Sequence, residues 1–245
     1  MYFWVKTIAL KIIAMIPARY DSKRLPGKLM MDLNGKSVIK TTLENIVNSN
    51  LFDAVYVVTD SQIIYDHLKQ FHQNILISNN EHISGSDRIA EFAQEMEVDI
   101  IINIQGDEPL IDPNQITQII TSFSQGSEKI ITLAKKITSK EAQNTNTVKV
   151  NFNSDMIATN FYRSANKDTS FLYKHIGVYG FKQDTLDRIC RLDTTENELK
   201  HKLEQLRWLD NNYKIKVVVT EQDSISIDTQ EDLDDLLKHH SEKLT

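Results

Sequence analysis

IIAMIPARYDSKRLPGK, residues 12–28, turns from apolar to cationic within a few positions. The apolar segment Ile12–Ile16 is typical of a buried β-strand, and it ends abruptly in a polar loop. This loop carries four cationic side chains within ten residues: Arg19, Lys23, Arg24 and Lys28. Because guanidinium forks and a mobile lysine ammonium both bind phosphate oxygens well, the loop is predicted to hold several phosphates at once.

The same loop lacks the glycine-rich patterns that bind phosphate through backbone N–H groups. Gly27 is its only glycine, and neither G-x-x-x-x-G-K-[ST] nor G-x-G-x-x-G occurs in the chain. A ligand would therefore be held mostly by side chains, and a dehydrogenase is disfavoured. Taken alone, a charge cluster of this kind is more often a solvated loop, so the functional interpretation depends on residues further along the chain.

The length of 245 residues fits one α/β domain, and an apolar fraction of 40% with a charged fraction of 25% is ordinary for a soluble globular protein. The net charge of −6 argues against generic nucleic-acid binding, although it leaves room for a small polyphosphate in a local pocket. The single cysteine, Cys190, excludes an internal disulfide and fits a reducing compartment. No apolar stretch reaches the roughly 18 residues of a membrane span, and Met1–Thr7 is interpreted as an N-terminal extension, so a cytoplasmic protein is predicted.

Apolar runs alternate with amphipathic helical patterns through the first half of the chain. The predicted strands are Lys11–Ile16, Ala54–Thr59, Asn74–Ile77, Ile100–Ile104 and Ile130–Leu133, and the predicted helices are Val38–Val47, Gln62–Phe71, Arg88–Met96 and Asn114–Phe123. This alternation predicts an α/β fold with a mostly parallel, Rossmann-like nucleotide-binding sheet and helices on both faces.

The second half changes character, because three strand patterns follow one another without helices. They are Thr147–Phe152, Met156–Tyr162 and Tyr173–Phe181, followed by helices at Thr185–Arg191 and Glu196–Asn211, a strand at Ile215–Val219 and a closing helix at Glu231–Lys238. We therefore expect a single domain, 1–245, with an antiparallel lobe inserted at 135–181. This lobe is the predicted contact of a homodimer.

Polar clusters follow four of the predicted strands. The basic loop follows the first strand, Asp60 the second, Ser84–Arg88 the third and Gln105–Pro109 the fourth. Because ligands of open α/β sheets bind beyond the carboxyl ends of the parallel strands, these clusters are predicted to form one site.

Two acidic residues are candidate metal ligands. Asp107 stands at the tip of an apolar strand, where Gly106 is interpreted as letting a ligand approach the backbone, and a carboxylate opposite a phosphate loop suits Mg²⁺. The other interpretation is a turn before Pro109, with Asp112 capping the next helix. Asp228 precedes a helix that Thr229 is predicted to cap, and from the residues alone its role as a second ligand stays open.

Other polar residues have a structural and a functional interpretation. Ser84–Arg88 suits an anion or a base edge at a helix N-terminus, or is a plain N-cap. His175 lies in an apolar strand, where a hydrogen-bonded core histidine is the commoner case. Glu204 and Arg207 are spaced as a helix-surface ion pair.

Six segments together resemble the CMP-KDO synthetases, the cytidylyltransferases that activate 3-deoxy-manno-octulosonate (KDO). The family patterns IPARYxSxRLPGK, SGTxR, NxQGDEP, H-[IL]-G-[IV]-Y, LEQLR and VDTxED have counterparts at Ile16–Lys28, Ser84–Arg88, Asn103–Pro109, His175–Tyr179, Leu203–Arg207 and Ile227–Asp232. Their order and spacing agree over nearly the whole chain, from about Ile12 onward. The resemblance implies transfer of CMP from CTP to KDO, with release of pyrophosphate, for lipopolysaccharide synthesis.

The resemblance also implies roles for individual residues. Arg19, Lys28, Asp107 and Asp228 would form the catalytic set, with Arg19, Arg24 and Lys28 on the CTP phosphates and Ser22 and Lys23 lining the same loop. Ser84, Gly85 and Arg88 would help to recognise the nucleotide. Asp107 and Asp228 would hold Mg²⁺. The sugar acid would contact Gln105, Arg163, His175, Tyr179, Glu204 and Gln205.

Three departures from the family pattern concern the sugar or dimer side. The family's tyrosine-phenylalanine-serine-arginine run is Asn160–Arg163 here, Ser164–Leu172 is short and polar, and His201 replaces an acid. They leave cytidylyl transfer intact but keep two alternatives open: a CMP-sialate-type synthetase and a cytidylyltransferase for a modified KDO. An inactive nucleotide-binding protein is the non-enzyme alternative, and the presence of both Asp107 and Asp228 speaks against it.

Overall fold

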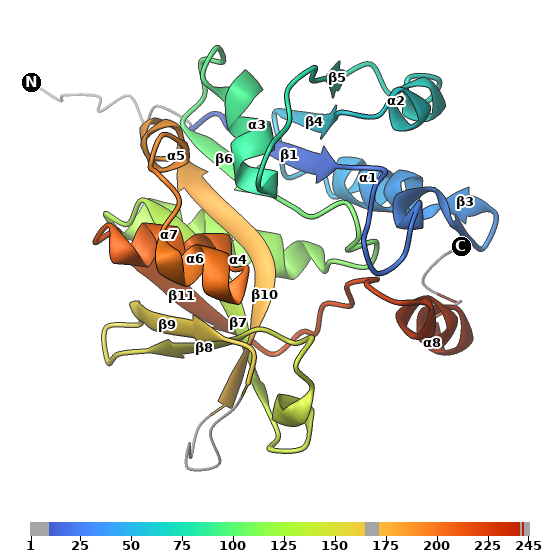
Figure 1. Ribbon diagram of the computed structural model, residues 1–245. Coiled ribbons are helices and arrows are strands. Elements are labelled where there is room, and N and C mark those ends of the chain that lie inside the picture. Colours follow the sequence, from blue (N-terminus) through green and yellow to red (C-terminus); the bar gives the residue numbers. More distant parts are fainter. Residues whose placement is uncertain (1–9, 165–171, 241, 243–245) are drawn as a thin grey trace, which may run out of the picture.

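The computed structural model describes residues 10–164, 172–240 and 242 (Figure 1). The predicted extension Met1–Thr7 and all but the ends of the Ser164–Leu172 segment lie outside the described residues.

A central sheet runs through the molecule in the order β11-β7-β10-β6-β1-β4-β5. Its strands are β1 (Ile12–Ala18), β4 (Ala54–Thr59), β5 (Ile75–Ile77), β6 (Ile100–Asn103), β7 (Ile130–Ile137), β10 (Leu172–Lys182) and β11 (Ile215–Thr220). Within it, β1 pairs in parallel with β4 and β6, β4 with β5, and β7 with β11. Only β10 is antiparallel to its neighbours β6 and β7, so the prediction of a mostly parallel sheet is confirmed.

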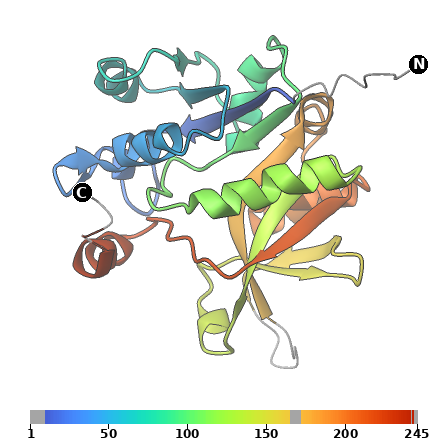
Figure 2. The same ribbon diagram turned by 180° about the vertical axis from the view of Figure 1, so that it is seen from behind.

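Helices cover both faces of this sheet, as the sequence predicts (Figures 1 and 2). They are α1 (Val38–Asn48), α2 (Gln62–Leu68), α3 (Gly85–Ala93), α4 (Pro113–Gln125), α5 (Gln183–Cys190), α6 (Glu196–His201), α7 (Glu204–Asp210) and α8 (Gln230–His240). The chain also forms short 3₁₀ turns at Lys28–Met30 and Glu141–Gln143 and a small hairpin of β2 (Asp32–Leu33) and β3 (Lys36–Ser37).

Strand β1 contributes side chains to two hydrophobic clusters, one on each face of the sheet. Its side chains alternate between the faces: Ala14 and Ile16 pack on the side of α1, α2, α4 and α8, whereas Ile13 and Met15 pack on the side of α3, α5 and α7. All four residues are at most 2% exposed, so β1 is apolar on both faces and carries no polar position until its end. The basic loop therefore begins where the buried strand leaves the sheet.

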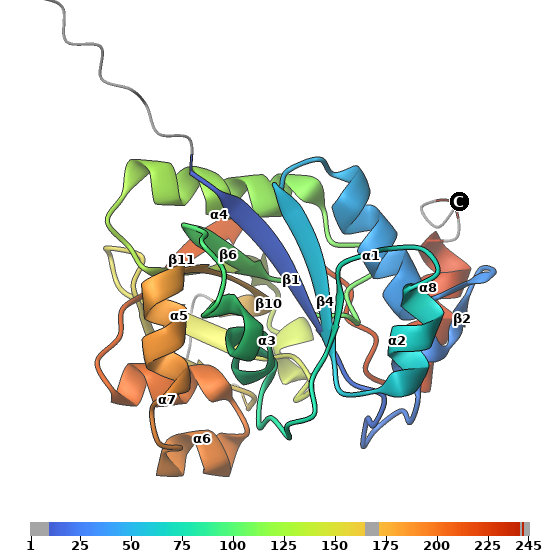
Figure 3. The ribbon, with the colours of Figure 1, turned by 90° about the horizontal axis from the view of Figure 1, so that it is seen from above.

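The predicted helix Glu196–Asn211 is wrong as a single element. It is divided into α6 and α7, because Lys202 adopts a left-handed conformation with φ of 54° and ends α6. Its N–H donates to the Glu198 carbonyl, which closes the last turn of α6. The LEQLR segment therefore begins a new helix, α7, whose apolar residues pack against the sheet. Figure 3 shows α6 and α7 as two separate helices.

An antiparallel hairpin extends the sheet where the sequence predicts an inserted lobe. Strands β8 (Lys149–Phe152) and β9 (Ala158–Tyr162) pair with each other, and β8 reaches β10 through the pair Lys149–Lys174. β10 belongs to both parts, since its second half pairs with β6 inside the main sheet. The division into a domain and a dimer-forming lobe stays a prediction.

Gly180 of β10 lies so close to α4 that a side chain has no room. A methyl group there would meet Phe123 Cε2 at 2.5 Å and Ile119 Cγ2 at 2.6 Å. Gly180→Ala is therefore expected to lower the free energy of unfolding by about 1–3 kcal/mol through overpacking. Urea denaturation measures this loss.

Gly126→Ala is the matched control for that experiment. At this extended position, a methyl group would crowd only the carboxyl end of Glu128, a side chain that is able to move. We expect little change in unfolding free energy. Equal losses in the two variants would contradict the packing argument.

Candidate functional site

The loops after β1, β5 and β6 meet around one pocket of about 150 Å³. We call it the cationic pocket, and its lining includes Arg19, Lys28, Ser84, Gly85, Arg88, Gln105 and Asp107. Arg88 also pairs with Asp60, which follows β4. The prediction that four polar clusters gather at the carboxyl edge of the sheet is confirmed. Ser22, Lys23 and Arg24 lie on the same loop but do not line this pocket.

Helix α3 begins at the cationic pocket. Ser84 is its N-cap, with Oγ accepting from the Asp87 N–H at 3.1 Å and donating to Asp87 Oδ2 at 2.8 Å. The Ser84 hydroxyl thus has a capping role, and the first turn of the helix still faces the cavity. Both interpretations of this segment are compatible with its position.

Gly106 allows the loop after β6 to pack on the end of β1. A methyl group there would lie 2.9 Å from Ile39 Cδ1 and 3.1 Å from the Pro17 carbonyl oxygen. The protein itself thus fills the space that a side chain would take. Because Gly106 also lines the cationic pocket, its interpretation as a place for close ligand approach stays a prediction.

Asp107 and Asp228 meet at the ammonium of Lys28, although they come from opposite halves of the chain. Lys28 Nζ donates to Asp107 and, at 3.0 Å, to Asp228 Oδ1, and Arg24 Nη2 lies 2.8 Å from the same Asp228 oxygen. Burial alone would lower the pKa of Lys28, but the two carboxylates outweigh burial and raise it. Burial likewise favours a higher pKa for Asp228, but Lys28 and Arg24 hold it below its ordinary value.

Two predicted helix caps lie near these aspartates in the sequence. Thr229 Oγ1 accepts from the Asp232 N–H while Asp232 Oδ2 accepts from the Thr229 N–H, so the predicted cap of α8 is confirmed and Asp228 is left to face Lys28. Asp112 caps α4 in a box with Gln115, which is also as predicted. The cap therefore accounts for Asp112 and not for Asp107.

The Lys28 ammonium lies between the carboxylates of Asp107 and Asp228, at the position that a bound metal ion would take. In the described part of the chain, no group of three or more His, Cys, Asp or Glu side chains is arranged to hold a metal ion. Mg²⁺ needs fewer protein ligands than that, because it takes one or two carboxylates together with phosphate oxygens and water. The donor set of Asp107 and Asp228 fits such an ion.

A second pocket, of about 380 Å³, adjoins the first and shares Gln105 and Asp107 with it. We call it the sugar pocket, after the ligand that the sequence resemblance predicts for Arg163 and His175, and its lining also includes Lys174, Asp223, Ser224 and Asp228. Arg163 is half-buried, and burial together with the nearby Arg24 lowers the pKa of its guanidinium. The structure thus places three predicted sugar contacts, Gln105, Arg163 and His175, in one pocket with the two aspartates.

His175 is buried beside a bulge of β10 that falls between Ile176 and Tyr179. Its Nε2 lies 2.9 Å from Thr132 Oγ1, and that hydroxyl is also 2.9 Å from the Val178 carbonyl. Because a hydroxyl has one proton, donation to Val178 leaves Thr132 to accept from His175 Nε2–H. Burial lowers the pKa of His175 to about 3, so the imidazole is neutral at neutral pH.

This burial predicts a loss of stability in acid. Above the ordinary histidine pKa of about 6.5, the folded and unfolded chains both carry a neutral ring. Between that value and about 3, the unfolded chain binds a proton that the folded one does not, so His175 destabilises the fold by up to about 1.4 kcal/mol per pH unit. His175→Gln should flatten the fall in unfolding free energy between pH 6 and 4, measured by urea denaturation. An unchanged slope would contradict the assignment.

Tyr179, Glu204 and Gln205 lie behind these pockets rather than in their linings. Tyr179 packs against Phe181 and Trp208, and its buried hydroxyl has no partner among the described residues. Glu204 Oε1 accepts from Ser86 Oγ at 3.1 Å, whereas its buried Oε2 has no such partner. Burial raises the pKa of both groups. Their predicted contact with a sugar stays a prediction.

The interpretation of Glu204 and Arg207 as a surface ion pair is wrong. Arg207 is 2% exposed, and its Nη2 donates to both carboxylate oxygens of Asp87, at 3.0 and 3.1 Å. Its Nε lies 3.4 Å from a carboxylate oxygen of Glu198. Arg207 of the LEQLR segment therefore joins α7 to α3, the helix that begins at the cationic pocket.

Several polar residues near the site were not singled out from the sequence. Glu108 is buried in the lining of the sugar pocket, where burial and the neighbouring Asp107 raise its pKa to about 7, and Ser224 Oγ donates to it at 2.8 Å. Lys174 donates to Asp223 and to the Ser224 carbonyl. No local pattern links these loops, since only the sheet order brings 108, 174 and 224 together.

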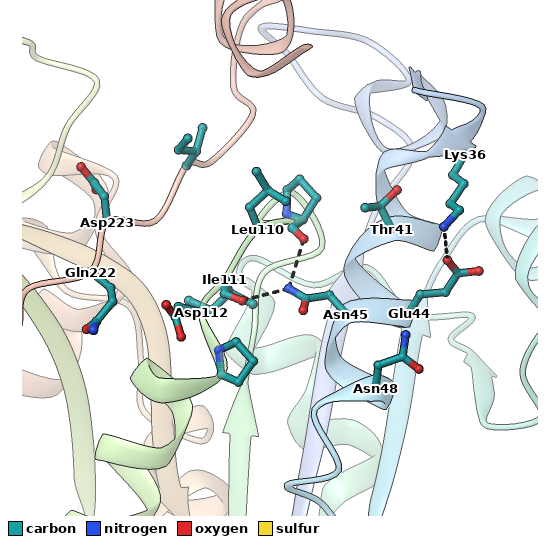
Figure 4. A pocket seen from close by; sticks show the side chains of 13 residues that line it. Lys36, Thr41, Glu44, Asn45, Asn48, Leu110, Ile111, Asp112, Gln222 and Asp223 are labelled. Carbon is teal, nitrogen blue, oxygen red and sulfur yellow. Dashed lines mark hydrogen bonds and ion pairs between the residues drawn. The ribbon is translucent and has the colours of Figure 1, made fainter. Parts of the chain in front are cut away.

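A larger pocket, of about 550 Å³, shares Asp223 and Ile225 with the lining of the sugar pocket (Figure 4). Residues of α1, the segment 109–113 and Gln222 line it, and the Asn45 amide there donates to the carbonyls of Pro109 and Ile111. It contains none of the predicted site residues. The volume of a pocket therefore does not identify the candidate site. The cations and carboxylates that meet at the cationic pocket do.

The fold and the cationic pocket define a nucleotide-binding α/β protein, and comparison with known proteins places it further. The family model described as cytidylyltransferase matches residues 13–216. A 3-deoxy-manno-octulosonate cytidylyltransferase of Christiangramia forsetii is 45% identical over 234 residues, which are 91% of this chain and 94% of that protein. The enzyme of the same name from Flavobacterium johnsoniae is 43% identical, with 92% and 96% covered.

A solved structure agrees with these sequence matches. It is described as CMP:2-keto-3-deoxy-manno-octonic acid synthetase complexed with CTP, is 30% identical and has a TM-score of 0.87 over 95% of this chain and 99% of that one. The chain belongs to the cytidylyltransferase family and, within it, to the 3-deoxy-manno-octulosonate cytidylyltransferases. The resemblance seen in the sequence is thus confirmed. None of the helices that the structure describes has the length and apolar character to cross a membrane.

Proposed function

We propose that this chain transfers CMP from CTP to the anomeric hydroxyl of KDO and releases pyrophosphate. The observation that carries the proposal is the pair of adjoining pockets that meet at Gln105 and Asp107, one cationic and one lined by Arg163 and His175. The names of the relatives and of the solved CTP complex support the same substrates.

The cationic pocket is the proposed nucleotide site. Arg19, Arg24 and Lys28 would bind the triphosphate, because a guanidinium or ammonium forms strong charge-assisted hydrogen bonds to phosphate oxygens. Ser22 and Lys23 would support the same loop, and Ser84, Gly85 and Arg88 would recognise the nucleoside. Supporting this, the first turn of α3 and the basic loop face one cavity.

Asp107 and Asp228 are the proposed holders of Mg²⁺. Bound there, the ion would neutralise part of the triphosphate charge. Lys28, which lies between the two carboxylates in this structure, would then be available to the phosphates. The support for this proposal is the fit of the donor set.

The second pocket is the proposed sugar site. Arg163 would bind the sugar carboxylate, and His175, as a neutral ring, would contact a hydroxyl. Tyr179, Glu204 and Gln205 are proposed as further contacts. Two buried polar atoms without partners among the described residues, Tyr179 Oη and Glu204 Oε2, support this proposal.

The chemistry needs no covalent enzyme intermediate. The anomeric oxygen forms a bond to the α-phosphorus as the bond from the α-phosphorus to the bridging oxygen breaks, the hydroxyl proton is lost, and pyrophosphate leaves. Such a transfer depends on alignment and on neutralising charge, which are the tasks of the two pockets and the basic loop.

Pyrophosphate release from each of CTP, UTP, ATP and GTP, with KDO, an 8-amino analogue and a sialic acid, tests the proposal. We expect the highest kcat/KM for CTP with KDO or its close analogue. A strong preference for the sialic acid would overturn the sugar assignment. Tight CTP binding without turnover on any sugar acid would indicate an inactive nucleotide-binding protein.

We also propose that the chain is a homodimer that meets through the lobe at 135–181. The support is the antiparallel hairpin of β8 and β9, which extends from the main sheet and exposes Thr159 and Asn160 (Figure 1). Light scattering coupled to size-exclusion chromatography would give the mass, and a mass of one chain at micromolar concentration would contradict the proposal.

A further inference from the structure

We propose that Lys149 is a positioning residue for the sugar site: its buried ammonium holds the backbone of Arg163 and of the segment 144–147 in place. This inference rests on the proposed function, because it assigns a role in binding the sugar acid. Lys149 lies on β8 and is 0% exposed. None of the sequence patterns singled it out.

Two carbonyl groups accept from the Lys149 ammonium. Nζ donates to the Asn144 carbonyl at 2.6 Å and to the Arg163 carbonyl at 2.5 Å. The Arg163 Nη1 in turn donates to the Asn146 carbonyl at 2.9 Å. These three bonds join the end of β9 to the segment before β8, and Asn144, Asn146, Thr147 and Arg163 all line the sugar pocket.

Strand pairing places Lys149 for this task. It lies opposite Tyr162 of β9 and opposite Lys174 of β10, so it is the residue of β8 next to the point where β9 ends. A side chain there that is long enough can reach past the strand end to Arg163. Strand pairing fixes the backbone of Tyr162, the last residue of β9. Arg163 follows this last paired residue, so strand pairing does not fix its backbone.

The charge of Lys149 is not needed for packing. Burying an ammonium costs several kcal/mol, and an apolar side chain of similar volume is often as stable or more so. Among the described residues no carboxylate forms an ion pair with Lys149, and burial together with Arg163 lowers the pKa of its ammonium. Because Lys149 itself does not line the sugar pocket, it acts there through the backbone groups that its ammonium holds.

The test compares Lys149→Met with the wild type in the KDO and CTP assay. We expect the KM for KDO to rise roughly tenfold or more, from the loss of charged hydrogen bonds that hold the site, while the KM for CTP changes by less than about twofold. Urea denaturation should show an unchanged or higher stability. Lys149→Gln, which keeps a shorter donor, gives a second variant if the first does not fold.

Lys216→Met is the matched control. Lys216 Nζ also donates to a carbonyl of the same hairpin, that of Asp155 at 2.9 Å, but it lines neither the cationic nor the sugar pocket. We expect unchanged KM values in this variant. Equal changes in both lysine variants would overturn the inference, since they would indicate a general effect on the hairpin.

A double-mutant cycle with Arg163→Ala separates positioning from stability. If Lys149 acts through Arg163, then Lys149→Met should raise the KM for KDO far less in the Arg163→Ala background than in the wild type. Additive effects would overturn the inference, as would a parallel rise in the KM for CTP. Failure of the wild type to use KDO would instead refute the proposed function, so the two failures are distinguishable.

Discussion

Asp107→Asn is expected to leave the fold intact and to lower turnover by about 10²–10³-fold or more, because it removes one charge at the point where the two pockets meet. Asparagine has the same shape and still accepts a hydrogen bond from Lys28. What it removes is the carboxylate that, with Asp228, surrounds the ammonium. Steady-state kinetics of pyrophosphate release at ordinary Mg²⁺ measures the loss, and circular dichroism checks the fold.

Asp112→Asn is the matched control for this change. Asp112 caps α4 away from the cationic pocket, and asparagine is as good an N-cap as aspartate. This variant should keep both stability and turnover. Near-full activity of Asp107→Asn, with the control also active, would place the metal site elsewhere.

Lys28→Ala is expected to weaken CTP binding by roughly 10–10²-fold, which is the range for loss of a charged hydrogen bond, while the affinity for the sugar acid changes little. Lys28 is 9% exposed and is the buried cation of the basic loop. In the free protein the same change removes the cation that Asp107 pairs with and leaves Asp228 with Arg24 alone, so stability should also fall. Calorimetric titration with CTP gives the affinity.

Lys36→Ala provides the control, since Lys36 forms only a half-exposed pair with Glu44 on α1. We expect unchanged CTP affinity there. If Lys28→Ala also bound CTP as tightly as the wild type, the basic loop would not be the phosphate site.

Local patterns of apolar and polar residues in the sequence predicted much of the fold. The apolar residues of β1, β4, β6 and β7 and the helical periods between them predicted a mostly parallel sheet with helices on both faces, as the structure has it. The caps at Asp112 and Thr229 were also readable, because a cap depends on residues three positions apart.

Other features were beyond any local pattern. A continuous helical period at Glu196–Asn211 does not reveal that Lys202 turns left-handed, because the packing of LEQLR on the sheet decides the break. No local pattern reveals that a side chain at Gly106 would collide with Ile39 and Pro17, since the neighbours of a glycine are set by tertiary packing.

The sequence by itself determined most of the elements, their order and the presence of a cationic loop at the end of the first strand. Tertiary structure alone decided that Asp107 and Asp228 meet at Lys28, that Arg207 braces α3 and that Lys149 reaches the Arg163 backbone. The physical reason is range. Periodicity and capping act over a few residues, whereas these contacts join segments that only the order of strands in the sheet brings within hydrogen-bond distance.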